Sequence, residues 1–260
     1  MTPAATPAAK LKLIYEMAEQ RYLRSLPIEH FMEATPQATQ RKITLESFDL
    51  IQTARPDVHC FNELLVQYPR GEDEYRPGQV VPDNMIVVHP GPVTAEGSFN
   101  TPLQPAGPLL VLEYVSKGNR RKDYEDNMVK YEHELKVPYY LLFYPDNEEL
   151  TVFRMAGGRY ATVPPNDTGR LPIPELELEA ALLGGWVRFW FRGELVPLPV
   201  DLLRDRDAER QARQAAERVA DQERQARLAA ETRADADRQA RLAAEAELAR
   251  LREQLKARGE

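Results

Sequence analysis

Apolar residues recur at helical spacing in two segments near the start of the chain. Residues 10–23 carry them three or four positions apart, and the same spacing returns over residues 35–54 until Pro56. This spacing gathers apolar side chains on one face of a helix, and a proline disfavours helical backbone at the residue before it. The pattern therefore predicts two helices ahead of Pro56.

The middle of the chain changes to short runs rich in β-branched and aromatic residues. Glycine, proline, asparagine or aspartate bounds each run, which is typical of strands. A charged segment of helical periodicity, residues 120–136, separates two of them, and this order predicts a parallel crossover. The fold class we expect is α/β, with a mixed central β-sheet flanked by helices. The predicted strands are residues 58–68, 80–89, 108–116, 139–144, 150–154 and 186–191.

The end of the chain is built from a charged repeat. The motif ERQAR occupies residues 209–213 and 223–227, and DRQAR occupies 237–241, so the period is 14 residues or two heptads. Alanine, arginine, glutamate and leucine favour helix, and opposite charges one turn apart support it. We predict a long helix over residues 201–260. Its alanine-rich seam is compatible with a coiled coil that pairs two copies through residues 205–260, or with a solvated single helix.

These patterns divide the chain into a helical segment (1–34), a strand-containing domain (35–200) and the repeat helix (201–260). The chain carries 41 acids against 34 lysines and arginines, a net charge of -7. Non-specific nucleic-acid binding needs local positive charge, so this balance allows it only at a basic patch. A single cysteine precludes an intrachain disulfide and suits a reducing compartment. With neither a secretory signal nor an apolar run of membrane-spanning length, we expect a cytoplasmic protein and no membrane partner.

Two acids stand among apolar residues: Asp83 within VVPDNMIVV and Glu113 within PLLVLEYVS. An unpaired buried carboxylate costs several kcal/mol, so each is expected to have a partner, a metal ion or a raised pKa. Mg²⁺ is commonly held by one or two carboxylates together with water and substrate phosphate. The plainer alternatives are a turn cap after Pro82 for Asp83 and a structural ion pair for Glu113. A basic cluster that could contact phosphate follows: Lys117, Arg120, Arg121 and Lys122.

Four segments together carry a family resemblance: PD at residues 82–83, LEYVS at 112–116, RRKDYEDNMVKY at 120–131, and VPYYLLFYPDNEELTVFRM at 137–155. Residues 33–155 resemble the bacterial family of putative restriction endonucleases with the PD-(D/E)XK nuclease fold. The resemblance implies a DNA endonuclease that uses Mg²⁺, for which Mn²⁺ can substitute. It further implies that Asp83, Glu113 and the backbone carbonyl of Tyr114 hold the metal ion.

The sequence departs from the nuclease pattern at its lysine. The general pattern places a lysine two residues after the glutamate, where this chain has Val115. Family members place a lysine on the following helix instead, at a position that corresponds here to Asn127 or Met128. We therefore name Lys130, and after it Lys117, as candidates for the catalytic lysine. The alternative is a non-catalytic, nuclease-like binding module that is assembled or partnered through its C-terminal coiled coil.

Overall fold

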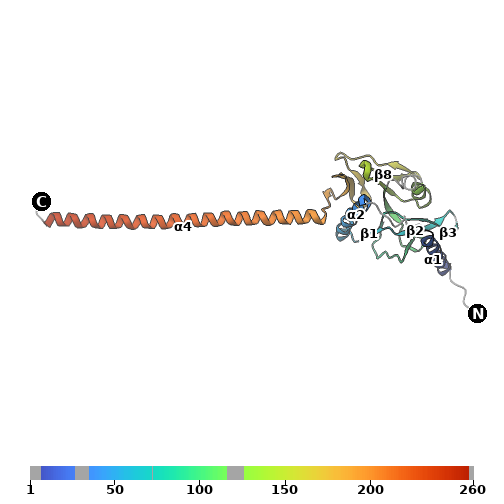
Figure 1. The fold of residues 1–260 in the computed structure, drawn as a ribbon, viewed down its shortest axis with the longest axis horizontal. Coiled ribbons are helices and arrows are strands. Elements are labelled where there is room, and N and C mark those ends of the chain that lie inside the picture. The colour runs from blue at the N-terminus through green and yellow to red at the C-terminus, as the bar shows by residue number, and fades with distance from the viewer. Residues whose placement is uncertain (1–6, 27–34, 72, 116–125, 258–260) are drawn as a thin grey trace, which may run out of the picture. The chain divides into compact units, whose positions relative to one another are not determined.

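The structure is a computed structural model, which describes residues 7–26, 35–71, 73–115 and 126–257. The chain divides into two units, Met1–Leu198 and Pro199–Glu260. Both predicted N-terminal helices are confirmed, as α1 (Pro7–Ser25) and α2 (Thr35–Ala54). The apolar faces of both helices pack against strands of the first unit (Figure 1).

A six-stranded sheet forms the centre of the first unit, in the order β1-β4-β6-β7-β8-β9. The neighbours β6 and β7 run parallel, which confirms the predicted crossover, and every other neighbouring pair in this sheet is antiparallel. The two central strands, β6 and β7, are buried on both faces of the sheet, as their continuous apolar runs indicate. The strands are β1 (Val58–Asn62), β4 (Asn84–Val88), β6 (Pro108–Tyr114), β7 (Tyr139–Tyr144), β8 (Glu149–Ala156) and β9 (Arg159–Thr162).

Two predicted strands are wrong in their extent. The run at residues 58–68 is interrupted at Glu63, whose backbone has a positive φ of 46°, and continues as β2 (Leu65–Arg70) in a separate sheet. The run at residues 80–89 also spans two strands, because β3 (Asp73–Val80) ends where it begins and β4 starts only at Asn84. Asp83 therefore lies just before β4. The strands β2 and β3, with β5 (Ser98–Asn100), make a three-stranded sheet in the order β3-β2-β5.

Each face of the central sheet packs against different elements. On one face α2 meets a four-stranded sheet, where the rings of Phe48 and Phe189 lie 5.4 Å apart. The other face packs against the three-stranded sheet and a short helix, α3 (Asn127–Val129), that continues as a π-helical turn, η4 (Lys130–Glu134). The four-stranded sheet comprises β10 (Leu171–Ile173), β11 (Leu178–Leu183), β12 (Trp186–Phe191) and β13 (Glu194–Leu195), of which only β12 was predicted. Short 3₁₀ turns lie at η2 (Thr101–Leu103), η5 (Pro145–Asn147) and η6 (Pro174–Leu176).

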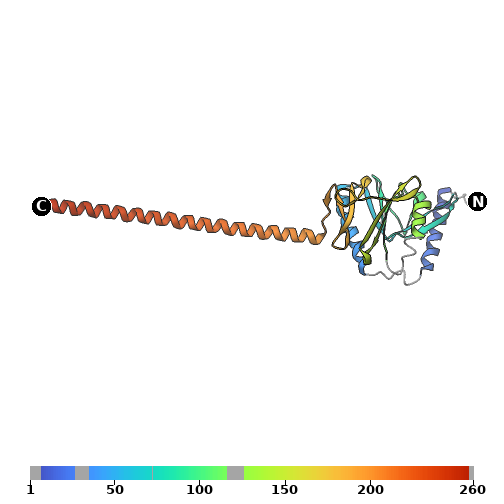
Figure 2. The same ribbon diagram turned by 90° about the horizontal axis from the view of Figure 1, so that it is seen from above.

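The second unit consists of the predicted long helix, α4 (Pro199–Ala257), drawn as one continuous helix in Figure 2. Its 59 residues correspond to a length of roughly 88 Å at 1.5 Å per residue. The described side chains of residues 202–254 are all exposed, and ion pairs such as Arg213–Glu217 and Arg227–Glu231 join successive turns. The coiled coil remains a prediction. Within the described part of the chain, none of the helices combines the length and apolar character that crossing a membrane requires.

Candidate functional site

The strand register brings three acids into one row across β1, β4 and β6, along the edge of the central sheet that the strand ends form. Asn84 of β4 lies opposite Asn62 of β1 on one side and Leu112 of β6 on the other. One step along, Asp83 is therefore aligned with Glu63 and Glu113, and the amide N–H of Glu63 donates to the carbonyl of Asp83 at 3.2 Å. The two acids singled out in the sequence thus end on neighbouring strands at the same level. This is the edge at which β6 and β7 reach their carboxyl ends.

Glu113 is buried and held by two donors from the helix that follows it. Glu113 is only 3% exposed. Its Oε1 accepts a hydrogen bond from the hydroxyl of Tyr131 at 2.6 Å and another from Nδ2 of Asn127 at 3.0 Å. Burial, and then the negative charge of Glu113, raise the pKa of the Tyr131 hydroxyl, and the charge of Asp83 adds to the rise. Tyr131 therefore stays protonated and acts as a donor. The two carboxylates influence the same hydroxyl, so they belong to one electrostatic site.

Asp83 is held by the backbone of β6 and by a side chain of α2. Its Oδ2 accepts the backbone N–H of Tyr114 at 2.5 Å, and its Oδ1 lies 3.4 Å from Nη2 of Arg41. Burial raises the pKa of the Asp83 carboxyl; the Tyr114 amide and the Arg41 charge oppose this rise, and Glu63 adds to it. This position is neither a simple turn cap nor a free surface acid. An additional positive charge beside it would lower the pKa of the Asp83 carboxyl and so favour its ionised form.

The first turns of α2 reach this edge and supply residues that the sequence reading missed. Gln37 donates through Nε2 to the carbonyl of Tyr114 at 2.6 Å, and Arg41, four residues later, pairs with Asp83. Two polar residues one turn apart on an otherwise apolar-spaced helix lie on the same face, which is the signal that could have indicated them. Glu63 and Tyr131 carried no such signal, because strand register brings the first to the site and helix packing the second, whereas Asn127 was named only as the position of the family lysine.

Of the two lysine candidates, only Lys130 lies within the described residues. Lys130 is half-buried in η4, next to Tyr131 and three residues after Asn127. Lys117, Arg120, Arg121 and Lys122 lie outside the described residues. Val115, at the position where the general nuclease pattern has lysine, is buried among apolar side chains.

The oxygen atoms at this edge suit a hard divalent cation. Mg²⁺ takes oxygen ligands and is often held by one or two carboxylates, with water and phosphate completing its coordination. The carboxylates of Asp83 and Glu113 and the carbonyl of Tyr114 are such ligands, and each already accepts a hydrogen bond from the protein. Among the residues described, no group of three or more His, Cys, Asp or Glu side chains converges on one point. The donor set therefore fits a site of two carboxylates and a carbonyl, with solvent and substrate supplying the remaining ligands.

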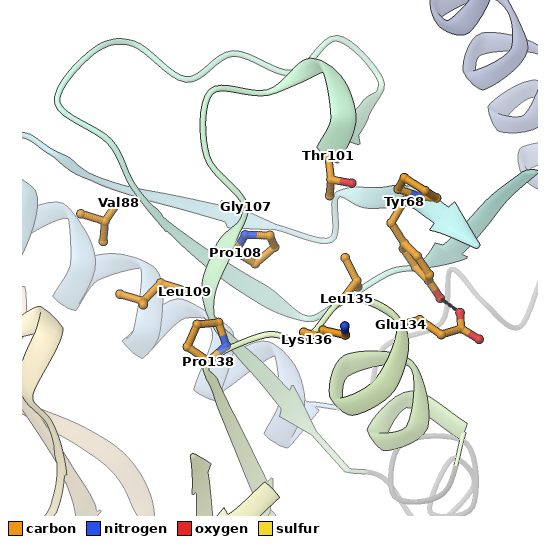
Figure 3. Close-up of a pocket in the computed structure, with 11 residues that line it drawn as sticks. Tyr68, Val88, Thr101, Gly107, Pro108, Leu109, Glu134, Leu135, Lys136 and Pro138 are labelled. Carbon is orange, nitrogen blue, oxygen red and sulfur yellow. Dashed lines mark hydrogen bonds between the residues drawn. The ribbon is translucent and has the colours of Figure 1, made fainter. Parts of the chain in front are cut away.

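A cavity of about 490 Å³ lies elsewhere, at the opposite end of β6 (Figure 3). Pro108 at the start of β6 and Pro138 just before β7 line it, together with Tyr68, whose hydroxyl donates to Glu134 at 2.7 Å. Since Glu113 lies near the other end of the same strand, this cavity is separate from the candidate site.

One solved structure and one family model match this chain. A crystal structure described as a putative nuclease belonging to DUF820, from Anabaena variabilis ATCC 29413, matches with a TM-score of 0.41 and 15% identity. The match covers 56% of this chain and 75% of that one. A search of curated proteins finds no match.

Residues 29–183 match the model of the Uma2 family, described as putative restriction endonuclease. The matched range is more than half of the 260 residues and includes Asp83, Glu113 and Asn127. The resemblance noted in the sequence is confirmed at the level of the family, and the mixed sheet flanked by helices is the expected fold class. The chain therefore belongs to the Uma2 family of putative restriction endonucleases.

Proposed function

We propose that this protein is a Mg²⁺-dependent DNA endonuclease that hydrolyses phosphodiester bonds, and that Mn²⁺ can replace Mg²⁺. The observation that carries the proposal is that Asp83, directly before β4, is aligned with Glu113 of β6 at one edge of the sheet. Family membership supports nuclease activity in general, and divalent metals are the usual requirement of such enzymes. The single free cysteine, Cys60, is compatible with the reducing cytoplasm, where we expect the protein to act.

In this proposal Asp83, Glu113 and the carbonyl of Tyr114 hold the metal ion, which when bound activates water and stabilises charge on the scissile phosphate. Tyr131 and Asn127 fix the Glu113 carboxylate through their hydrogen bonds to Oε1. Lys130 or Lys117 orients the attacking water. The basic residues that hold the DNA backbone are Lys117, Arg120, Arg121 and Lys122.

Calorimetric titration of Mn²⁺ into the full chain tests the metal site before any DNA substrate is known. We expect saturable binding that Asp83→Asn and Glu113→Gln each weaken at least tenfold. Glu149→Gln, which alters an exposed acid on β8, should leave binding unchanged. Nicking of supercoiled plasmid in Mg²⁺ should then follow the same order among these variants. Absence of Mn²⁺ binding both alone and with DNA would overturn the proposal.

The second candidate is a non-catalytic nuclease-like module, and one observation favours it. The neutral amide of Asn127 contacts Glu113 from the helix where family members carry lysine. Asn127→Lys is the discriminating variant. A module that lost its lysine should bind DNA without cutting it and gain nicking activity on this substitution. If Lys130 already serves, Lys130→Met should abolish nicking by the unmodified chain.

We also propose that two copies pair through residues 205–260, which would present two sites to the two strands of a duplex. The alanine-rich 14-residue repeat supports this pairing. Sedimentation equilibrium tests it: the full chain should dimerise, whereas a chain ending at Leu198 should remain monomeric. A monomeric full chain at 100 μM, roughly the upper range of such measurements, would leave α4 as a single helix.

A further inference from the structure

Glu63 is the third acid of the row, and it is not among the proposed metal ligands. It directly follows β1 with a positive φ of 46°, and its amide N–H donates to the Asp83 carbonyl at 3.2 Å. Its side chain is 54% exposed, yet its Oε1 lies only 2.8 Å from Nη2 of Arg41. The turn therefore fixes a second carboxylate beside Asp83 and directs it to the same guanidinium.

One nitrogen of Arg41 contacts both acids. Nη2 lies 2.8 Å from Glu63 and 3.4 Å from Asp83, and the Arg41 side chain is only 13% exposed. A cation so far removed from water needs a charged partner, and losing that partner is costly. The shorter contact is to Glu63, so this partner remains if Asp83 is taken up by another cation.

We propose that Arg41 is a built-in counter-cation of Asp83 that an entering divalent ion displaces, and that Glu63 retains the guanidinium when this happens. The inference rests on the proposed metal-dependent function. Without metal, Arg41 offsets the charge of the Asp83 carboxylate, whose residue is aligned with Glu113 in the strand register. When a divalent ion binds Asp83, the two cations repel each other, and Glu63 allows Arg41 to remain paired. Arg41 and Glu63 are thus positioning residues that set how readily the site accepts metal.

A double-mutant cycle read by Mn²⁺ calorimetry separates this exchange from simple attraction through space. Arg41→Met should tighten Mn²⁺ binding about tenfold by removing a competitor, and Glu63→Gln should weaken it about fivefold by strengthening the hold of Arg41 on Asp83, both within the usual range of such couplings. In the Arg41→Met background, Glu63→Gln should change the Kd less than twofold. If instead Glu63→Gln weakens binding equally with and without Arg41, the inference is overturned.

A matched control lies on the same helix. Lys42 and Glu46 form an i,i+4 ion pair at 3.7 Å, and Lys42 is 74% exposed. The cycle of Lys42→Met and Glu46→Gln should leave the Mn²⁺ Kd unchanged. A change as large as that from Arg41 and Glu63 would mean that any charge on α2 acts, and would also overturn the inference.

Two further measurements keep the test decisive. Should Arg41→Met fail to fold, Arg41→Gln, which keeps N–H donors without the charge, takes its place in the cycle. Either Arg41 variant should lower the melting temperature of the metal-free protein. This decrease should be smaller in saturating Mn²⁺, because the bound ion then balances the charge of Asp83. Failure of the wild type and all variants to bind Mn²⁺ would overturn the proposed function itself. Binding by the wild type with an additive cycle would overturn only the exchange between Arg41 and Glu63.

Discussion

Asn127 donates a hydrogen bond through Nδ2 to Oε1 of Glu113 at 3.0 Å, from a helix that begins 14 residues further along the chain. The Tyr131 hydroxyl binds the same oxygen from one turn later. Two neutral donors of this helical segment thus hold one oxygen of a buried acid. Arg41 brings positive charge to the same site through its contact with Asp83.

Replacement of Glu113 should depend strongly on the substitute. Glu113→Ala removes the acceptor of two buried donors, so it should lower the free energy of unfolding by roughly 2–4 kcal/mol. Glu113→Gln keeps an acceptor and relieves repulsion with Asp83, so stability without metal should be unchanged or higher. Urea denaturation measures both, with Glu149→Ala as an exposed control. Equal loss in both variants would mean that the charge of Glu113 is required for folding.

Asp83 should make the metal-free protein less stable as the pH rises. Its pKa is raised in the folded state, mainly by burial, so the native protein holds this proton more tightly than the unfolded chain does. The resulting stability is fully present below the unfolded pKa of about 3.9 and is lost as the pH rises through the folded value. Asp83→Asn should lack this loss and gain melting temperature relative to the wild type from about pH 4 upward. Parallel pH profiles for the two proteins would contradict this assignment.

Gln40 should be among the most sensitive positions of α2. It is fully buried and exchanges two hydrogen bonds with the backbone of Val187 in β12, at 3.1 and 2.9 Å. Gln40→Ala leaves a buried N–H and C=O of a strand without these partners and should cost roughly 2–4 kcal/mol in chemical denaturation. Gln52→Ala on the exposed side of the same helix should cost less than about 0.5 kcal/mol.

Cys60 should be unreactive in the folded protein. Burial, aided by the charge of Asp49, raises the pKa of its thiol to about 12. Because the thiolate is the reactive form, labelling by a disulfide reagent at pH 8 should be about a thousandfold slower than for a free cysteine. The same reagent in urea provides the control. Rapid stoichiometric labelling without urea would show that the half-buried thiol is open to solvent and that the pKa assignment is wrong.

Removal of α4 should leave the first unit intact. The described side chains of residues 202–254 are exposed, so a chain ending at Leu198 loses little burial. Its melting temperature should stay within about 2 °C of the full chain, since less than 1 kcal/mol is involved. Far-ultraviolet circular dichroism should meanwhile lose a large helical contribution. A larger thermal shift would reveal a contribution of α4 to the stability of the first unit.

Local patterns in the sequence were sufficient for several elements. Apolar spacing predicted α1 and α2, and the charged repeat predicted α4. The apolar runs predicted β6 and β7, and the helical segment between them predicted their parallel order. These features depend on side-chain periodicity and propensity, which a single segment carries by itself. The pairing of PD with LEYVS likewise indicated the family before any geometry was available.

Only tertiary structure decided which residues gather around the two acids. The break at Glu63, the position of Asp83 ahead of β4, and the approach of Gln37 and Arg41 all follow from strand register and helix docking. Asn127 reaches Glu113 in the same way. The physical reason is that register and docking are set by the whole core at once. A sequence reveals that an acid will be buried, whereas its partners depend on which distant segments the core brings beside it.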